Sequence, residues 1–253
     1  MSCENPDNGH GFGKGFALTT LDINVVHHCN LRCANCSHGS PFAKKYIMGL
    51  DVMEKDLWSI SPVLHVDEIL IVGGEPLLRK DIPNIISTCR DSHVADNIVI
   101  VTNGILLSKI DYWDALENVK IRVSCYPGVN RAEIENVLRQ HTKNFVIHNY
   151  DKFYAQFRKT KDSFYRCKWK NQCMTLHEGF LYKCPQSCFW PDRFFKSTRK
   201  DGLALDRINE DKLHNFMHSS EPLETCLYCD ASEKKVAWKQ SNTYEEWLKD
   251  STW

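Results

Sequence analysis

The sequence has no excess of charge of either sign and no long apolar run. Over 253 residues, 32 Lys and Arg residues balance 32 Asp and Glu residues. Nucleic acids and anionic membranes attract strongly basic proteins, so this balance predicts neither as a partner. No apolar run is long enough to span a bilayer. The first residues, M-S-C-E-N-P-D-N-G-H-G-F-G-K-G, lack the basic and apolar parts of a signal peptide. We therefore expect a cytoplasmic protein without a membrane partner.

Several common functional motifs and all internal repeats are also missing. The sequence contains no P-loop, no Rossmann glycine fingerprint and no nucleophile elbow. Hydrophobic residues make up 42% and charged residues 25%, which is ordinary for a globular protein. The length suits one barrel-sized domain, or one domain with a small appendage.

Cysteine, in contrast, is abundant. Twelve cysteines without a secretion signal indicate metal ligation in a reducing compartment rather than a disulfide scaffold. Three of them, Cys29, Cys33 and Cys36, lie in V-H-H-C-N-L-R-C-A-N-C-S, directly after an apolar run. Three thiolates so close together can bind three irons of a cubane 4Fe–4S cluster and leave the fourth iron open. The alternative is a structural zinc loop, completed by His27, His28 or His38.

Apolar runs alternate with helical patterns over the first 150 residues. We predict strands at 20–26, 67–76, 97–102, 119–124 and 144–148. Helices are expected at 50–64 with Asp51 as N-cap, at 81–89, through Trp113 and Leu116, and at 131–139. This alternation favours a parallel βαβ architecture, whose chemistry lies at the C-terminal ends of the strands.

Short polar motifs follow the predicted strands at that end. The second strand leads into Gly73, Gly74, Glu75 and Pro76, where two glycines allow close backbone approach to a ligand. The alternative for this motif is an ordinary turn. The third strand ends in Thr102-Asn103-Gly104. The fourth carries Arg122 and Ser124 on one face, followed by Cys125.

The cysteine loop, G-G-E-P and T-N-G together resemble the radical S-adenosylmethionine (SAM) superfamily. The resemblance implies a partial (β/α)6 TIM-like barrel in an α/β chain. It also implies that the open iron chelates the amino and carboxylate groups of SAM. By the same resemblance, G-G-E-P holds the SAM amino group, and Thr102 or Asn103 reaches the ribose or methionine part. Arg122 and Ser124 would bind the SAM carboxylate if they point inward. The sequence departs from the family pattern at Asn35, where an aromatic residue is usual.

A second group of cysteines follows in the region that we assign to residues 151–253, after an arm at 1–17 and the barrel core at 18–150. M-T-L-H and F-L-Y-K flank Glu178-Gly179, which predicts a hairpin that brings Cys173 and Cys184 together. The region resembles the SPASM and twitch subdomains of radical SAM enzymes, which bind auxiliary 4Fe–4S clusters. The ligands implied by this resemblance are Cys167, Cys184, Cys226 and Cys229. Alternatives are Cys173 in place of Cys167, and a zinc ribbon.

The resemblance implies reductive cleavage of SAM to a 5′-deoxyadenosyl radical, which abstracts a hydrogen atom from a substrate. An external one-electron donor such as flavodoxin or ferredoxin would be the partner. We expect a small polar substrate, such as an amino sugar, a cyclitol or a natural-product intermediate. Its oxidation would use the second cluster, whereas epimerisation would use a cysteine as hydrogen donor, Cys125 or Cys173, with Cys188 as another spare thiol. The alternatives are a maturase of ribosomal peptides and a non-catalytic zinc or iron–sulfur module. The C-terminal stretch from Val236 is expected to form a short amphipathic helix.

Overall fold

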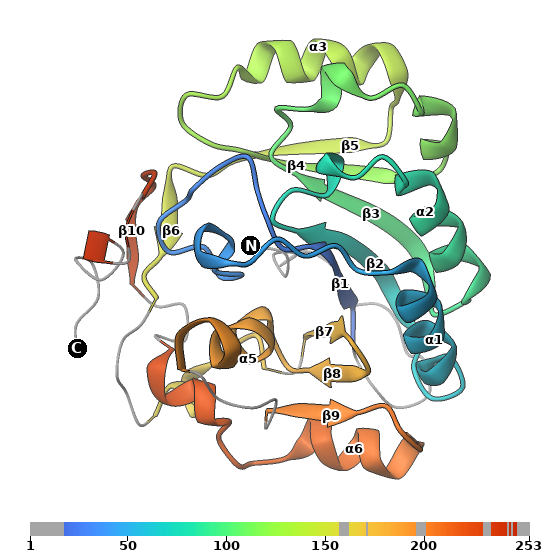
Figure 1. Ribbon diagram of the computed structural model, residues 1–253, viewed down its shortest axis with the longest axis vertical. Helices are drawn as coiled ribbons and strands as arrows, with labels where there is room; N and C mark the ends of the chain where they lie inside the picture. The colour runs from blue at the N-terminus through green and yellow to red at the C-terminus, as the bar shows by residue number, and fades with distance from the viewer. Residues whose placement is uncertain are drawn as a thin grey trace.

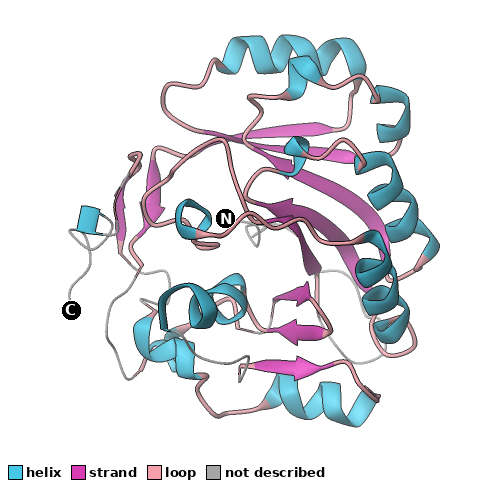
Figure 2. Ribbon diagram, viewed as in Figure 1, coloured by secondary structure: helices cyan, strands magenta, loops and turns pink. Residues whose placement is uncertain are grey.

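A computed structural model describes residues 18–156, 162–170, 172–195, 201–229 and 234–241, together with 243, 245 and 246. It is a mixed α/β structure built on one eight-stranded sheet with the order β5-β4-β3-β2-β1-β7-β8-β9. Helices α1, α2 and α3 cover the outer side of the parallel part, and β7 to β9 continue the sheet beyond β1 (Figures 1 and 2). The predicted α/β fold with a largely parallel sheet is confirmed.

The strands are short and mostly buried. Their bounds are β1 Thr20–Val26, β2 Val66–Gly73, β3 Ala95–Thr102, β4 Lys120–Cys125, β5 Phe145–Asn149, β6 Lys152–Tyr154, β7 Cys173–His177, β8 Phe180–Tyr182, β9 Gly202–Ala204 and β10 Lys235–Ala237. The α-helices are α1 Leu50–Ile60, α2 Ile82–Asp91, α3 Arg131–His141, α4 Ser163–Arg166, α5 Pro185–Trp190 and α6 Glu210–His218. Shorter helical turns are η1 Ser40–Phe42, η2 Pro76–Leu78, η3 Leu107–Lys109, η4 Trp113–Leu116, η5 Pro191–Phe195 and η6 Glu224–Tyr228.

Strand β1 is buried along its whole length because both of its faces are covered. Leu21, Ile23 and Val25 belong to the main apolar core beneath the helices. The alternate residues Asp22 and Asn24 are also fully buried, and they face the inside of the curved sheet. Apolar residues on one face and polar residues on the other suit a barrel wall that lines a ligand site.

The hairpin of β7 and β8 joins the barrel directly. β7 pairs in parallel with β1, with Asp22 beside Thr175 and Ile23 beside Leu176. β8 runs antiparallel to β7, as the predicted hairpin requires. The sheet therefore continues across the predicted boundary near residue 150, and the division into domains itself stays a prediction.

The C-terminal segment forms a strand where we expected a helix. β10 pairs antiparallel with β6, and residue 240 forms a bridge with Cys33 in the cysteine loop. In Figure 1, β10 and β6 lie side by side next to this loop. The helix prediction from Val236 is therefore wrong for residues 236–241, because their backbone is engaged by two distant segments.

Two further expectations are corrected. The predicted helix through Trp113 and Leu116 is a pair of 3₁₀ turns, η3 and η4. Helix α1 is capped by the backbone of Gly49, and Asp51 lies within its first turn.

The predicted arm at 1–17 lies outside the described residues. Among the helices that the structure describes, none has both the length and the apolar character needed to cross a membrane.

Candidate SAM and iron–sulfur site

The cysteine loop is fixed to the end of β2 by the two glycines of G-G-E-P. Gly74 N–H donates to Val26 O at 2.7 Å, and Glu75 N–H donates to His28 O at 3.1 Å. A Cβ on Gly73 would lie 2.3 Å from Val26 O, and one on Gly74 would lie 2.0 Å from His28 O. Both contacts are too short for any side chain. The glycines therefore let the segment that leads into the cysteine loop lie directly against the sheet.

Glu75 ties this turn to the next strand end. Its buried carboxylate accepts hydrogen bonds from Thr102 Oγ1 at 2.7 Å, Asn103 N–H at 2.8 Å and Leu77 N–H at 3.1 Å. Burial raises the pKa of Glu75, while these three donors oppose the shift. The carboxylate thus holds T-N-G in place.

Asn103 connects the strand end to the cysteine loop. Its Nδ2 donates to Asn30 Oδ1 at 2.6 Å and lies 3.8 Å from Cys29 Sγ. Through Glu75 and Asn103, three motifs that are far apart in the sequence become one hydrogen-bonded unit.

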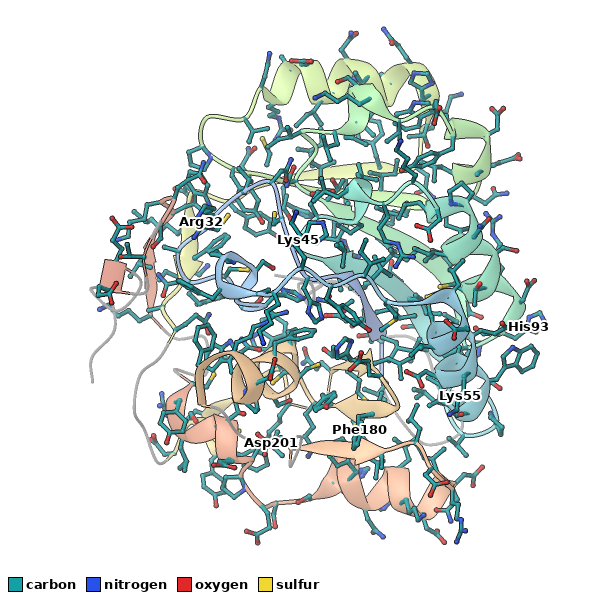
Figure 3. All side chains as sticks on the ribbon, in the orientation of Figure 1. Arg32, Lys45, Lys55, His93, Phe180 and Asp201 are labelled. Carbon is teal, nitrogen blue, oxygen red and sulfur yellow. The ribbon has the colours of Figure 1, made fainter. Side chains whose placement is uncertain are left out.

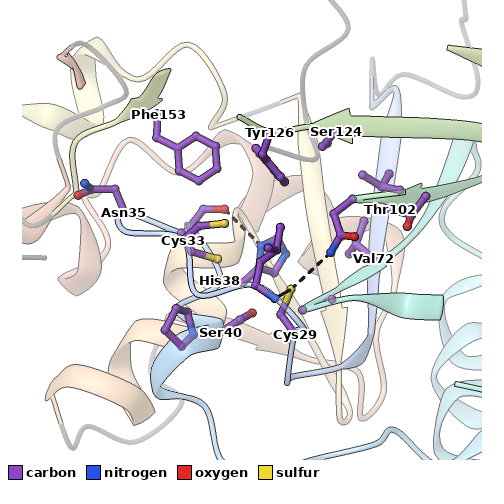
Figure 4. A pocket seen from close by; sticks show the side chains of 18 residues that line it. Cys29, Cys33, Asn35, His38, Ser40, Val72, Thr102, Ser124, Tyr126 and Phe153 are labelled. Carbon is purple, nitrogen blue, oxygen red and sulfur yellow. Dashed lines mark hydrogen bonds between the residues drawn. The ribbon is translucent and has the colours of Figure 1, made fainter. Parts of the chain in front are cut away.

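A cavity that is partly open to solvent lies above these motifs (Figure 4). Many predicted site residues line it: Cys29, Cys33, Cys36, Gly73, Gly74, Thr102, Asn103 and Ser124. Pro76 begins η2 directly behind the two glycines. The structure therefore brings the three cysteines and most of the predicted SAM contacts to one cavity.

Two predicted residues of β4 lie elsewhere. Arg122 is not among the described residues that line this cavity. Its Nη2 donates to Glu68 Oε2 at 2.7 Å, and Glu68 also accepts from Lys120. Cys125 is buried with Val123 in the apolar core, on the face of β4 opposite Ser124. This placement is that of a packed core thiol.

Aromatic side chains close one side of the cavity, and the sequence analysis did not identify them. Tyr126 and Phe153 line the cavity. The Tyr126 ring stacks on Trp238 at 5.7 Å and meets Phe153 edge-on at 5.5 Å. Trp238 comes from the C-terminal segment that borders the cysteine loop. These rings supply apolar surface that could hold an adenine and exclude water.

Asn35 takes the place of the family's usual aromatic residue for a local reason. Its φ is 59°, a left-handed conformation that Asn tolerates better than bulky residues do. Its side-chain Oδ1 accepts a hydrogen bond from Gln156 N–H at 3.0 Å. Asn35 thus turns the loop between the second and third cysteines and fastens it to the chain after β6.

Burial favours the neutral form of the Cys29 and Cys33 thiols. Burial raises the pKa of Cys29 and of Cys33 to about 12. Iron would supply the positive charge that makes them thiolates, so the donor set fits a cluster. Among the described residues, no three His, Cys, Asp or Glu side chains are placed to hold a single metal ion. In a cubane, each cysteine binds a different iron.

The second cysteine group lines a separate small cavity. Cys167, Cys184, Cys226 and Cys229 all face it. Cys184 caps α5, and its Sγ accepts from Ser187 N–H at 3.4 Å. Burial raises the pKa of Cys184 to about 12 and that of Cys226 to about 11. Four partly buried thiols around one cavity suit a four-cysteine iron–sulfur cluster, in which each thiolate binds a different iron.

Positive charge and backbone anchoring accompany this second cavity. Lys170 and Lys183 line it, and Lys183 Nζ donates to Met217 O at 3.2 Å. The carboxylate of Asp201 accepts from Glu224 N–H and Thr225 N–H, each at 2.9 Å, and so fixes the start of η6. Figure 3 places Asp201 beside this part of the chain, and Arg32 and His93 toward opposite sides of the molecule.

The two spare cysteines are placed as follows. Cys188 is buried on α5 with Tyr182 and Phe189. Cys173 begins β7, where it pairs with Thr20. The side chain of Cys173 lies outside what the structure describes, so its role stays a prediction.

Comparison with known proteins decides the family. The family model described as "Radical SAM superfamily" matches residues 23–165, more than half of the chain. The chain belongs to the radical SAM superfamily. This family implies a 4Fe–4S cluster and SAM as cofactors, and the cavity lined by Cys29, Cys33 and Cys36 has the donors for both.

Curated relatives share only part of the chain. The radical SAM protein is 36% identical over 96 residues to a "Probable GTP 3′,8-cyclase" of Methanococcus vannielii, and 34% identical over 100 residues to a "GTP 3′,8-cyclase" of Peptoclostridium acidaminophilum. Each match covers 38% of this chain, and 32% and 30% of the relatives, respectively. The chain thus spans about a third of the length of these relatives.

A solved structure matches most of the fold. The crystal structure of BtrN in complex with AdoMet and 2-DOIA aligns with a TM-score of 0.53. The alignment covers 83% of this chain and 85% of BtrN, at 15% sequence identity. At this identity the likeness concerns the fold alone.

Proposed function

We propose that this protein is a radical SAM enzyme that acts on a small polar molecule and oxidises or epimerises it. The observation that carries the proposal is the single cavity lined by Cys29, Cys33 and Cys36 together with the ends of β2, β3 and β4. Bound there, the cluster and SAM would supply a carbon radical able to take a hydrogen atom from an unreactive carbon.

The chain's own residues bind, orient and shield in this proposal. Gly73 and Gly74 present the backbone to the SAM amino group. Thr102 and Asn103, both fixed by Glu75, face the ribose or methionine part. Ser124 offers a hydroxyl on the adjacent strand. Tyr126, Phe153 and Trp238 exclude water from the reacting carbon, because their rings close one side of the cavity.

We propose further that Cys167, Cys184, Cys226 and Cys229 hold an auxiliary 4Fe–4S cluster. The support is that all four line one cavity with Lys170 and Lys183, whose charges would offset an anionic cluster. Such a cluster could accept the electron left by a two-electron oxidation. A zinc ion on the same thiols remains the competing assignment, and it would leave oxidation without this acceptor.

The small-substrate proposal draws support from the fold likeness to BtrN, whose complex contains 2-DOIA. The names of the curated relatives make GTP a second compound to test. A ribosomal peptide remains the alternative substrate. The electron would come from a flavodoxin or ferredoxin, in the cytoplasm, where thiols stay reduced.

Iron counting on cysteine variants tests both sites. After anaerobic reconstitution, wild type should hold about eight irons per chain. The triple variant Cys29→Ala, Cys33→Ala, Cys36→Ala and the quadruple variant Cys167→Ala, Cys184→Ala, Cys226→Ala, Cys229→Ala should each hold about four. Cys89→Ala is the matched control, because Cys89 is a core thiol outside both cavities. It should leave the iron content unchanged.

Product analysis completes this experiment. With dithionite, wild type should form 5′-deoxyadenosine from SAM, and the triple variant should form none. Iron near zero in the triple variant, together with zinc on the remaining cysteines, would exclude the auxiliary cluster. Unchanged 5′-deoxyadenosine formation in the triple variant would reject the proposed function itself.

A further inference from the structure

Three histidines and one arginine surround a phenylalanine ring where the cysteine loop meets β7 and α5. These residues are His27, His38, His177, Phe189 and Arg193, and we call them the histidine–arginine cluster. The loop and α5 are joined at this point, since Trp190 Nε1 donates to Ser37 O at 2.9 Å. The cluster thus lies between the segments that carry the two cysteine groups.

The ring of Phe189 organises this cluster. The ring centroids of His27 and His177 each lie 5.3 Å from it, and that of His38 lies 5.6 Å from it. The guanidinium carbon of Arg193 is 4.5 Å from the same centroid. Stacking on a ring fixes the plane of a guanidinium and leaves its N–H groups available for a ligand.

Polar atoms of Arg193, His27 and His38 are buried without a partner among the described residues. In the described part of the chain, nothing hydrogen-bonds to Nη1 or Nη2 of Arg193 or to Nε2 of His27 or His38. His38 is only 7% exposed. A buried polar atom without a partner costs about 1 to 3 kcal/mol, and natural proteins rarely leave several together. These atoms therefore call for a bound group.

Strands β1 and β7 also carry buried polar atoms that have no partner among the described residues. Asn24 on β1 is fully buried, and neither polar atom of its amide has a partner among the described residues. The hydroxyl of Thr175, on the adjoining strand β7, is in the same situation. Buried donors and acceptors thus continue from Asn24 and Thr175, on the inside of the sheet, toward Arg193.

The side chains that make up the cluster indicate what it binds. It contains one guanidinium and three imidazoles, and no carboxylate. Outside the cluster, Oε2 of Glu178 lies 4.0 Å from His177 Nε2. The groups that act electrostatically on Arg193 are the thiols of Cys36 and Cys188 and the exposed carboxylate of Asp192. A buried guanidinium in such surroundings suits a bidentate oxyanion.

The position links this site to the SAM cavity. His38 lines that cavity beside Cys36, and Figure 4 shows its ring among the lining side chains. Ser40, whose buried hydroxyl also lacks a partner in the described chain, lines the same wall. The Arg193 side chain packs behind this wall, since a Cβ on Gly39 would lie 3.3 Å from its Cδ. A molecule in the cavity could thus extend one end toward Arg193.

We propose that the histidine–arginine cluster binds an anionic group of the substrate, either a carboxylate or a phosphoryl group. Arg193 supplies two parallel N–H donors, and His38 supplies Nε2–H when its Nδ1 accepts from Ser37 Oγ, 3.3 Å away. This inference rests on the proposed function and narrows it to anionic small molecules. The competing role for Arg193 is to balance the charge of the iron–sulfur cluster that Cys36 would hold.

Anion binding to the reconstituted, SAM-bound protein tests this proposal. Sodium phosphate and sodium acetate are titrated against sodium chloride at equal ionic strength, and the midpoint of thermal unfolding is followed. We expect a saturable rise of the midpoint with phosphate or acetate. The anion that saturates at lower concentration identifies the group as phosphoryl or carboxylate.

Three variants of arginine assign the binding. Arg193→Gln should raise the dissociation constant of the anion at least about tenfold. Arg139→Gln is the control, because Arg139 is exposed on α3 and paired with Glu135, and it should leave binding unchanged. Arg193→Lys keeps the charge and loses the paired donors, so its affinity should fall between wild type and Arg193→Gln. If Arg193→Gln does not fold, Arg193→Lys decides the matter, and an affinity equal to that of wild type overturns the proposal.

Other outcomes would also overturn it. These are the absence of a saturable response to both anions in wild type, or equal affinity in wild type and Arg193→Gln. A shifted reduction potential of the cluster in Arg193→Gln with unchanged anion affinity would assign Arg193 to charge balance instead. On the same preparations, 5′-deoxyadenosine formation is measured separately. Formation of 5′-deoxyadenosine without anion binding rejects this inference alone. Anion binding without formation of 5′-deoxyadenosine rejects the proposed function alone.

Discussion

At the scale of single residues, the site depends on glycines whose backbone contacts exclude any larger side chain. Gly74 lies so close to His28 O that any side chain would collide with the backbone. The same turn forms two backbone hydrogen bonds with the segment leading to Cys29. The geometry of the cysteine loop is therefore set as much by the glycines of β2 as by the loop's own residues.

We predict that Gly74→Ala displaces the cysteine loop. The new Cβ would lie 2.0 Å from His28 O, so the backbone has to move, at a cost of about 1 to 3 kcal/mol. Iron after reconstitution should fall from about eight to about four per chain. Gly49→Ala is the control, because its Cβ would come too close only to the movable carboxylate of Asp51. Full iron content in Gly74→Ala would contradict this account of the loop.

Glu75 offers a second test at this scale. In Glu75→Gln, one acceptor becomes an amide donor that faces either Asn103 N–H or the hydroxyl of Thr102 and the N–H of Leu77. We expect the loss of one buried hydrogen bond to raise the dissociation constant of SAM about tenfold, or about 1.4 kcal/mol. Equilibrium dialysis with SAM at matched iron content measures this. Glu135→Gln on α3 should bind SAM as wild type does, and equal affinity in all three proteins would refute the role of Glu75.

At the scale of elements, the C-terminal segment holds the cysteine loop from the side opposite the glycines. Ala34 N–H donates to Lys239 O at 2.9 Å, and Ser241 N–H donates to Arg32 O at 2.7 Å. The side chain of Gln240 accepts from Arg32 N–H at 3.1 Å. The loop that carries three cysteines is thus paired like a strand, which keeps it ordered although its own sequence has little secondary-structure preference.

Removing one of these bonds should loosen the loop. Ser241→Pro lacks the N–H that reaches Arg32 O, whereas Ser241→Ala keeps it and loses only the hydroxyl. We expect the cluster of Ser241→Pro to be extracted by a chelator several times faster than that of wild type, and the cluster of Ser241→Ala to be extracted nearly as slowly as that of wild type. Loss of the absorbance of the iron–sulfur cluster under anaerobic conditions follows the rate. Equal rates in the two variants would show that this pairing does not protect the cluster.

The sequence predicted the elements whose signal is local. β1 to β4 contain apolar runs that are mostly buried, and β5 is an apolar run that is half-buried. These local patterns identify the strands without knowledge of their partners. The cysteine spacing, G-G-E-P and T-N-G are equally local. The strand β10 was missed because its partners, β6 and the cysteine loop, lie about 80 and 200 residues earlier in the chain. Arg193 was missed because only the folded chain brings it to Phe189 and the three histidines.

At the scale of the whole molecule, the barrel and the second cysteine region share one core. Met174, Leu176 and Leu181 belong to the same apolar cluster as Leu21 and Ile23 of β1. Leu205, Leu213 and Met217 of the following segment belong to it as well. All six are nearly or fully buried. The two predicted regions are therefore packed as one structure, whatever their separate chemistry.

This shared core predicts that residues 1–150 do not fold by themselves. Burial of each of the six side chains stabilises the fold by about 1.5 to 3 kcal/mol. Their sum of about 9 to 18 kcal/mol is comparable to the net stability of a typical domain. The fragment also leaves β1 as an unpaired edge, which favours aggregation. We expect it to lack a cooperative thermal transition, whereas the full-length quadruple variant of Cys167, Cys184, Cys226 and Cys229 keeps one. A sharp transition in the fragment would mean that the barrel is an independent domain and that the second region is an addition to it.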